Sequence, residues 1–286
     1  MSQMPRALLE RIGDIKALDR VGKTVGKAFD GAVKPGALKD FLAGTWLGHP
    51  LHPVLTDLPI GFWSSSFALD VFGGKDGERA SEILLGLGVL SALPTAASGL
   101  TDWTDTGGAA RRIGLVHAIG NVATTACFTA SLVARRRGHR RKGIALSALG
   151  VGGQSFSAYL GGHLSFGKGI GVDNTAFDRE PRRWTAVVEI AALNDGKPVK
   201  AEAAGADVLL YRDGPELFAI SDTCSHRGCS LSDGDVRDRV VECACHGSAF
   251  RLGDGEIVRG PATAPQPAYD TRVTDGVVEV RLRRRK

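Results

Sequence analysis

Four apolar stretches fill much of the first half of the chain, and they constrain its fold more than any other feature. They cover residues 54–72, 83–100, 113–134 and 143–164, and the last three contain no charged residue. About 20 residues of this kind cross the hydrocarbon layer of a membrane as a helix. They are rich in Gly, Ala, Ser and Thr, which let membrane helices pack closely, whereas soluble helices keep one polar face. The pattern predicts a four-helix transmembrane domain over residues 46–166.

The segment before these stretches, residues 1–45, has a helical pattern of its own. Its apolar residues follow steps of three and four at Leu8, Ile12, Ile15, Leu18, Val21, Val25 and Phe29. This spacing predicts an amphipathic segment. Such a segment lies on the bilayer surface or packs against a partner or the rest of the chain, and the sequence leaves these alternatives open.

Basic residues cluster near the apolar stretches. The formal net charge is +5, and the densest runs are "RRRGHRRK" at 135–142 and "RLRRRK" at 281–286. Basic runs beside apolar segments indicate membrane orientation rather than nucleic-acid binding, and we expect no nucleic-acid partner. The loop at 135–142 favours the cytoplasm for its side of the membrane, which places the C-terminal part of the chain on the outer face.

After residue 166 the pattern changes. Residues 167–183 form a Gly-rich and then charged connector, and from residue 184 apolar residues alternate with polar ones in "TAVVEI", "DVLLYR" and "GVVEVRL". Turn sequences such as "RDG" and "GDGE" separate these runs. The fold class expected is therefore multidomain, with an all-α membrane domain followed by a small all-β domain at 184–286.

Two boxes within the β domain combine cysteine with histidine. They are "CSHRGCSL" at 224–231 and "CACHGSAF" at 243–250. Cys224 with His226, and Cys243 with His246, provide one thiolate and one imidazole from each of two loops. This donor set suits a tetrahedral zinc ion. It equally suits a [2Fe–2S] cluster in which two Cys hold one iron and two His hold the other.

Together with "GPATAP" at 260–265, the two boxes resemble the Rieske family over residues 184–282. The resemblance implies a [2Fe–2S] cluster held by Cys224, His226, Cys243 and His246. It also implies surrounding residues that shape the cluster pocket. In this sequence they are Gly228, Leu231, Gly247, Ser248, Phe250, Gly260 and Pro261.

The family resemblance extends to residues beyond the four ligands. In Rieske proteins of cytochrome bc complexes, cysteines at the positions of Cys229 and Cys245 form a disulfide that joins the two loops. Ser248 matches a serine that donates a hydrogen bond to the cluster. Phe250 stands where high-potential members carry a tyrosine. The resemblance therefore implies a potential below the upper end of the family range of about −150 to +300 mV.

The membrane half contains a second set of motifs. "HPLHPVLTDLPIGF", "GLVHAIGN" and "YLGGHLSFGKGIGV" resemble an uncharacterised family of four-span bacterial membrane domains, which has no chemistry to carry over. Four spans would place His49, His52, His117 and His163 on one face of the membrane. They suit hydrogen-bonded interfacial residues, a haem b site, a quinol pocket or a simple metal site, and these alternatives stay open.

These patterns predict a membrane-anchored Rieske electron-transfer protein. It would pass single electrons between a quinol or protein donor and a redox partner, as a component of an oxidoreductase system without a separate catalytic domain. The alternative is a redox sensor or assembly protein whose membrane domain is only an anchor.

Overall fold

The structure is a computed structural model, and it describes residues 4–284. The chain forms two compact units. One contains the chain up to Lys34 together with Leu51–Ile170, and the other contains Pro35–Pro50 together with the chain from Gly171.

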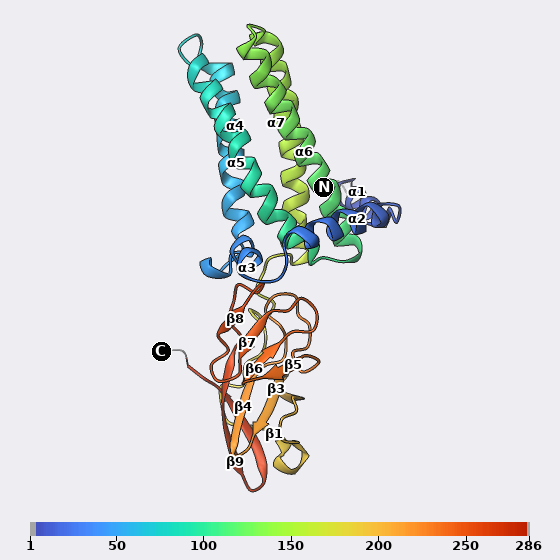
Figure 1. The fold of residues 1–286 in the computed structure, drawn as a ribbon, viewed down its shortest axis with the longest axis vertical. Helices are drawn as coiled ribbons and strands as arrows, with labels where there is room; N and C mark the ends of the chain where they lie inside the picture. The colour runs from blue at the N-terminus through green and yellow to red at the C-terminus, as the bar shows by residue number, and fades with distance from the viewer. Residues whose placement is uncertain (1–3, 285–286) are drawn as a thin grey trace. The chain divides into compact units, whose positions relative to one another are not determined.

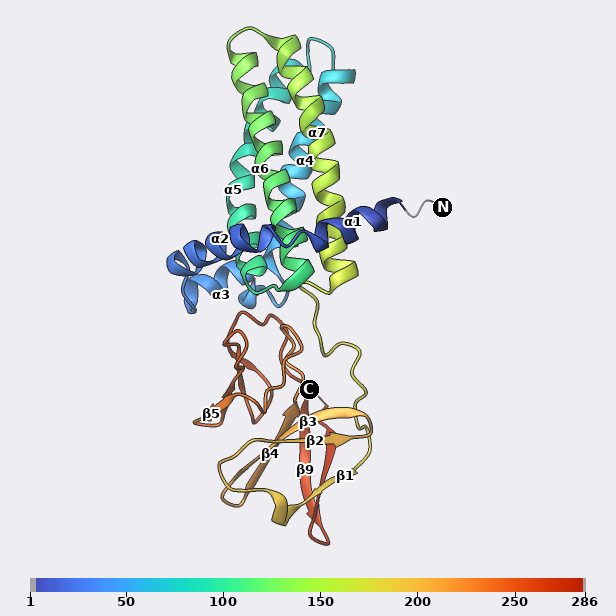
Figure 2. The ribbon, with the colours of Figure 1, turned by 90° about the vertical axis from the view of Figure 1, so that its right-hand side faces the viewer.

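Four long helices form the body of the first unit. They are α4 (Leu51–Phe72), α5 (Glu78–Thr104), α6 (Gly108–Arg136) and α7 (Arg140–Gly162), and they run side by side in Figures 1 and 2. The first three apolar stretches of the sequence each lie within one of them, and the fourth, residues 143–164, begins in α7 and ends in a π-helical turn at His163–Gly167. In the described part of the chain, α5 and α6 are long and apolar enough to cross a membrane.

The four helices pack as a bundle around small residues. Helix α4 packs on α5 and α7, and α6 packs on the same two helices, so α4 and α6 face each other across the centre. Trp63 of α4 stacks on Phe128 of α6 with ring centroids 4.3 Å apart. A Cβ atom at Gly150 of α7 would lie 2.8 Å from the Phe128 ring, so this glycine makes room for the stack.

One end of the bundle is joined by a buried ion pair. Arg135 Nη1 of α6 donates to Asp70 Oδ1 of α4 at 2.6 Å, and both side chains are fully buried. The serines Ser81 and Ser147 accept further bonds from the same guanidinium. Arg140 adds a second cation to Asp70 at 3.2 Å.

The N-terminal helices α1 (Met4–Asp14) and α2 (Leu18–Ala32) lie across the long helices (Figure 2). Leu9 and Ile12 of α1 are buried against Ile113 and Leu160, so packing against the rest of the chain is the alternative that the structure supports. Leu8, Ile15 and Val21, which belong to the same apolar series, are exposed. The segment is not one continuous helix, because the chain turns after α1 and again after α2.

The second unit contains the β domain. Within the described residues, ten strands form two antiparallel sheets, in the orders β1-β10-β9-β4-β3-β2 and β5-β6-β7-β8. The larger sheet comprises β1 (Thr185–Glu189), β2 (Val199–Ala203), β3 (Ala206–Asp213), β4 (Glu216–Ser221), β9 (Ala268–Thr274) and β10 (Val277–Leu282). The smaller sheet comprises β5 (Asp235–Arg237), β6 (Val240–Glu242), β7 (Ala249–Arg251) and β8 (Ile257–Arg259). The expected all-β C-terminal domain is confirmed.

Each sheet of this unit has its own apolar core. Val208, Leu210 and Val278 are fully buried in the larger sheet. Leu231, Val241 and Phe250 are fully buried in a second cluster that also contains Cys224 and Cys243. The two cysteines thus lie where the ligand loops meet the apolar core. Two short 3-10 helices, Thr45–Leu47 and Ile190–Ala192, and the helix α3 (Ala37–Ala43) complete the unit.

Candidate metal centre

The two cysteine–histidine boxes fold into loops of the same design. In the first, which follows β4, Gly228 N donates to Cys224 O and Cys224 N donates to Cys229 O. In the second, between β6 and β7, Gly247 N donates to Cys243 O and Cys243 N donates to Ser248 O. Gly228 and Gly247 have φ of +72° and +77°, in the left-handed region that favours glycine. Both glycines are therefore required by the turn itself.

The two ligand cysteines lie side by side. Their sulfurs share a hydrogen bond, and each sulfur also accepts backbone N–H groups from the residues two and three positions later. The bond to Cys224 lowers the pKa of Cys243 to about 6, whereas the bond to Cys243 and burial raise the pKa of Cys224. Backbone donors stabilise negative charge on sulfur. The backbone donors at both sulfurs therefore suit the negative charge of metal-bound thiolates.

The two histidines of the boxes form a second pair. The rings of His226 and His246 lie with centroids 5.0 Å apart and planes at 84°. Burial lowers the pKa of His226 to about 2, and the neighbouring charges of Arg227 and His246 act in the same direction. A histidine of this kind stays neutral at physiological pH, which is the form that binds metals. Two thiols and two imidazoles brought together in this way fit a [2Fe–2S] cluster with one Cys pair and one His pair.

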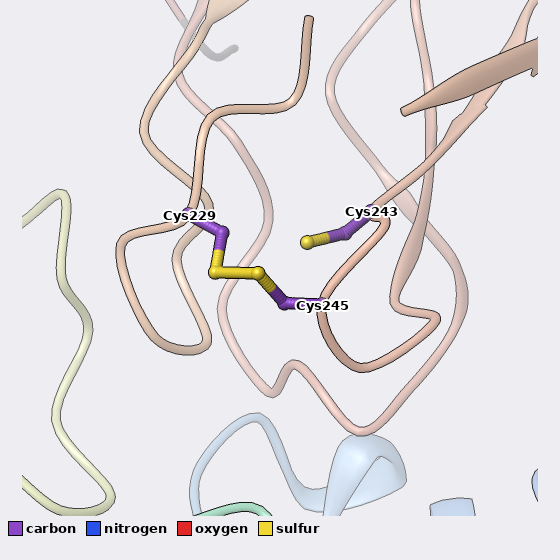
Figure 3. Close-up of side chains that lie close together, drawn as sticks. All are labelled: Cys229, Cys243 and Cys245. Carbon is purple, nitrogen blue, oxygen red and sulfur yellow. A yellow bond between two sulfur atoms is a disulfide. The ribbon is translucent and has the colours of Figure 1, made fainter. Parts of the chain in front are cut away.

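A disulfide links the two loops. Cys229 and Cys245 are bonded, as Figure 3 shows, with Cα atoms 6.6 Å apart and a sequence separation of 16. The Cys243 sulfur lies within 4.8 Å of both disulfide sulfurs. The expected pairing of these two cysteines is confirmed.

The third loop bonds to both boxes. Gly260 and Pro261 are buried, and the peptide bond between them is cis. Ala262 N donates to Ser248 Oγ at 3.0 Å, and Ser225 Oγ donates to Ala264 O at 2.6 Å. Because Ser248 Oγ accepts this bond, its own proton remains for donation toward the centre. Leu231 and Phe250 are fully buried in one apolar cluster with the two cysteines, which shields the sulfurs from water.

Two residues that support the first loop carried no signal in the sequence. Asn174 of the connector donates its Nδ2 to His226 O at 2.9 Å and to Ser225 O at 3.2 Å. Asp222 is buried and accepts from Ser230 Oγ at 2.6 Å and from Ser232 N at 2.7 Å. Asn174 holds the first loop by bonds to a distant part of the chain, and Asp222 holds it through its carboxylate. The spacing of residues in the sequence does not reveal either kind of bond.

The segment Pro35–Pro50 covers the third loop. Thr45 Oγ1 donates to Ala262 O at 3.1 Å, and the Asp40 carboxylate accepts the N–H of Gly260. A Cβ atom at Gly260 would collide with Thr45 Oγ1 and lie 2.8 Å from Asp40 Oδ1. Burial raises the pKa of Asp40. Lys39 is 7% exposed, and its positive charge acts on His226.

Of the four histidines expected at the membrane face, the structure brings two together. His52 of α4 and His117 of α6 have ring centroids 6.5 Å apart. His163 instead lines a cavity of about 800 Å³ with Leu9, Glu10 and Tyr159 among its walls. His49 belongs to the other unit, where its Nδ1 lies 3.1 Å from Pro50 O.

Comparison with known proteins agrees with this geometry. Residues 183–270 match the Rieske [2Fe-2S] domain family, and residues 48–174 match "Predicted membrane protein (DUF2231)". The anthranilate 1,2-dioxygenase ferredoxin subunit of Burkholderia cepacia is 34% identical over 99 residues, which are 35% of this chain and 92% of that protein. Ferredoxin CarAc of Metapseudomonas resinovorans is 34% identical over 98 residues, which are 34% of this chain and 92% of that protein.

Among solved structures, the ferredoxin of carbazole 1,9a-dioxygenase from Nocardioides aromaticivorans IC177 is 29% identical with a TM-score of 0.33, covering 34% of this chain and 96% of that one. The paired thiols, the paired imidazoles and the matched relatives lead to one conclusion: through its C-terminal domain, the chain belongs to the Rieske [2Fe–2S] family, and it joins this domain to a membrane domain of the DUF2231 type.

Proposed function

We propose that this protein is a membrane-anchored electron carrier whose [2Fe–2S] cluster is held by Cys224, His226, Cys243 and His246. The observation that carries the proposal is the convergence of two buried thiols and two imidazoles from two loops that a disulfide joins. A zinc site needs the same four donors, but the matched relatives are ferredoxins.

The residues around the cluster set its reduction potential. When bound, the cluster takes up and releases one electron at a time. The backbone N–H groups at the two sulfurs favour the reduced, more negative state because they donate to sulfur, and we expect the Ser248 hydroxyl to do the same. Phe250 provides no hydroxyl at its position. We therefore place the potential below the upper end of the Rieske range.

Chemical analysis of the full-length protein tests the cluster. Anaerobically purified protein should contain two irons and two acid-labile sulfides per chain, and dithionite should produce the EPR signal of a reduced Rieske cluster. Replacing either His226 or His246 by Cys should retain iron but change that signal. Zinc without labile sulfide would refute the proposal.

The redox partner is best sought among proteins. The relatives are, by their names, ferredoxin subunits of dioxygenases and a ferredoxin, which supports an oxygenase or another oxidoreductase component as acceptor. The membrane domain supports a quinol as an alternative donor. Stopped-flow reduction by a short-chain quinol analogue separates the two, because a carrier supplied only by proteins will not be reduced at a rate above that of the detergent control.

The four long helices support a membrane arrangement. We place α4 to α7 as four spans, with the β domain on the outer face, because the disulfide favours an oxidising compartment and the basic loop at 135–142 favours the cytoplasm. Alkaline phosphatase fused after Lys286 should then be active in a bacterial host, and a green fluorescent protein fusion at the same position should be dark. The reverse result would place the domain inside.

A redox sensor or assembly protein is the second candidate, because the Pro35–Pro50 segment bonds to the third loop, which in turn bonds to Ser248 of the second box. A carrier should be reduced and reoxidised through many cycles by its partners. A sensor should show a change in α3 accessibility with the redox state and no steady turnover.

A further inference from the structure

The helical unit is built from two copies of one helical hairpin. In the first helix of each hairpin, matching residues recur 65 positions apart: His52, Trp63, Ser66 and Asp70 correspond to His117, Phe128, Ser131 and Arg135. In the second helix they recur 62 positions apart: Ser81, Gly88, Thr95 and Gly99 correspond to Gly143, Gly150, Ser157 and Gly161.

The contacts within the two hairpins match as well as the residues do. Ser66 Oγ donates to Ser81 O at 2.8 Å, and Ser131 Oγ donates to Gly143 O at 2.7 Å. His52 Nδ1 lies 2.9 Å from Thr95 O, and His117 Nδ1 lies 2.8 Å from Ser157 O. The α4–α5 and α6–α7 hairpins are therefore equivalent, and an approximate two-fold axis relates them through the bundle.

Equivalent residues meet at this axis. Trp63 stacks on Phe128, Asp70 pairs with Arg135, and His52 faces His117 with the ring planes at 89°. A two-fold axis brings each residue near its own counterpart. The first two pairs satisfy each other by stacking and by charge, whereas the two imidazoles meet edge to face and bond through their Nδ1 atoms to other partners.

The two histidines are prepared as ligands. A carbonyl oxygen only accepts, so the Nδ1 atoms must carry the protons that they donate to Thr95 O and Ser157 O. This leaves each Nε2 with a lone pair, which is the arrangement found in metal-binding histidines. Asn121 Nδ2 donates to His117 Nε2 at 3.0 Å, as expected if this nitrogen carries the lone pair.

Glycines make room for both rings. A Cβ atom at Gly99 would lie 2.6 Å from the His52 ring, and one at Gly161 would lie 3.1 Å from the His117 ring. Both rings are partly buried between the helices. Core sites of helix bundles are built in this way, from side chains on facing helices.

The donor set identifies the ligand class. Among the described residues, no third Cys, His, Asp or Glu gathers with this pair, so a bare zinc ion would lack half of its ligands. Haem iron brings four nitrogen ligands of its own and needs only axial ones. With metal–nitrogen bonds of about 2.0–2.1 Å, two opposed imidazoles hold their ring centroids about 6.3 Å apart, close to the 6.5 Å observed here.

We propose that His52 and His117 bind one haem b as its two axial ligands, with Nε2 of each histidine on the iron. The site lies in the helical unit and does not depend on the Rieske assignment. A missing haem signal would therefore overturn this proposal alone, and a missing Rieske signal would overturn the proposed function alone.

Full-length protein, purified in detergent from cells grown with a haem precursor, tests the proposal. The pyridine haemochrome assay should find about one haem b per chain, and the oxidised protein should give the EPR signal of low-spin iron with two histidines. His52→Ala and His117→Ala should each lower haem content at least tenfold. His139→Ala, in the exposed loop before α7, is the matched control and should retain haem.

A variant that keeps a ligand excludes a purely structural explanation. His52→Met should retain haem and shift its potential upward, because methionine with histidine raises the potential of haem iron. The Rieske EPR signal of each variant reports whether the chain is intact. Wild-type protein that carries no haem and takes up none when haemin is added would overturn the proposal, as would His52→Ala protein with full haem content.

Discussion

At the scale of single residues, the charges around His226 influence the reduction potential of the cluster. Lys39 is buried, and its positive charge acts on this histidine from a different part of the sequence. A nearby positive charge favours the more negative, reduced state of a redox centre. The lysine therefore contributes to the potential without being a ligand.

Replacing this lysine tests that role. Lys39→Gln should lower the potential of the cluster, because the reduced state loses a stabilising charge. An EPR-monitored redox titration of full-length protein measures the shift. The exposed Lys34 provides the control, and Lys34→Gln should leave the potential unchanged. Equal potentials for wild-type and Lys39→Gln protein would contradict the argument.

The disulfide gives a second prediction at this scale. Cys229 and Cys245 close a loop of about 15 residues, and opening such a loop costs about 3 kcal/mol. Cys229→Ser should therefore keep all four ligands and bind the cluster, but lose it at lower denaturant concentration. Visible absorption during guanidinium titration follows this loss. Cys127→Ser, which removes a free cysteine of α6, should not change the denaturant concentration at which the cluster is lost. A disulfide reductant should not lower this concentration further in Cys229→Ser protein, because its disulfide is already gone.

At the scale of elements, α3 and the turn after it depend on one glycine. Gly260 has no side chain at the point where Thr45 Oγ1 and the Asp40 carboxylate approach it. The segment Pro35–Pro50 is therefore attached to the third loop by contacts that only glycine permits. Because Ala262 bonds to both Thr45 and Ser248, a change at α3 reaches the cluster pocket through one residue.

Gly260→Ala should detach α3 from the third loop. The added methyl group would overlap Thr45 Oγ1, so the segment must move while the four ligands stay in place. Hydrogen exchange measured by mass spectrometry should show faster exchange over residues 36–47, with little change in the larger sheet. Gly253→Ala, where a Cβ atom meets nothing within 4 Å, is the control. Unchanged exchange in α3 would contradict the attachment.

At the scale of the whole molecule, the ion pair of Asp70 and Arg135 joins the two equivalent hairpins. Removing Asp70 would leave Arg135 and Arg140 close together without their shared carboxylate. Removing Arg135 would leave Asp70 still paired with Arg140. The two substitutions are therefore not equivalent.

Asp70→Asn should destabilise the helical unit by about 3–5 kcal/mol, the usual cost of breaking a buried pair, and Arg135→Gln should cost less. Unfolding in mixed detergent micelles, followed by circular dichroism, measures both. Asp57→Asn, at an exposed position of α4, should cost nothing measurable. An equal loss for the two variants at the pair would show that Arg140 does not support Asp70.

The sequence by itself determined the features that depend on neighbours along the chain. The apolar stretches lie in helices because their length and composition suit a helix at each position. Each Cys–His box could be recognised in the sequence because its thiol, imidazole and glycine lie within a few residues of one another. The pairing of Cys229 with Cys245 followed from a family resemblance carried by the same boxes.

Tertiary structure decided which distant segments meet. The four membrane histidines looked alike in the sequence, yet only His52 and His117 face each other, because the two-fold arrangement of the hairpins puts them on one axis. His163 instead faces a cavity beneath α1. Asn174, Lys39 and Thr45 reach the cluster loops across long separations. Such contacts depend on how helices and sheets pack, and no local motif around any one of these residues records that packing.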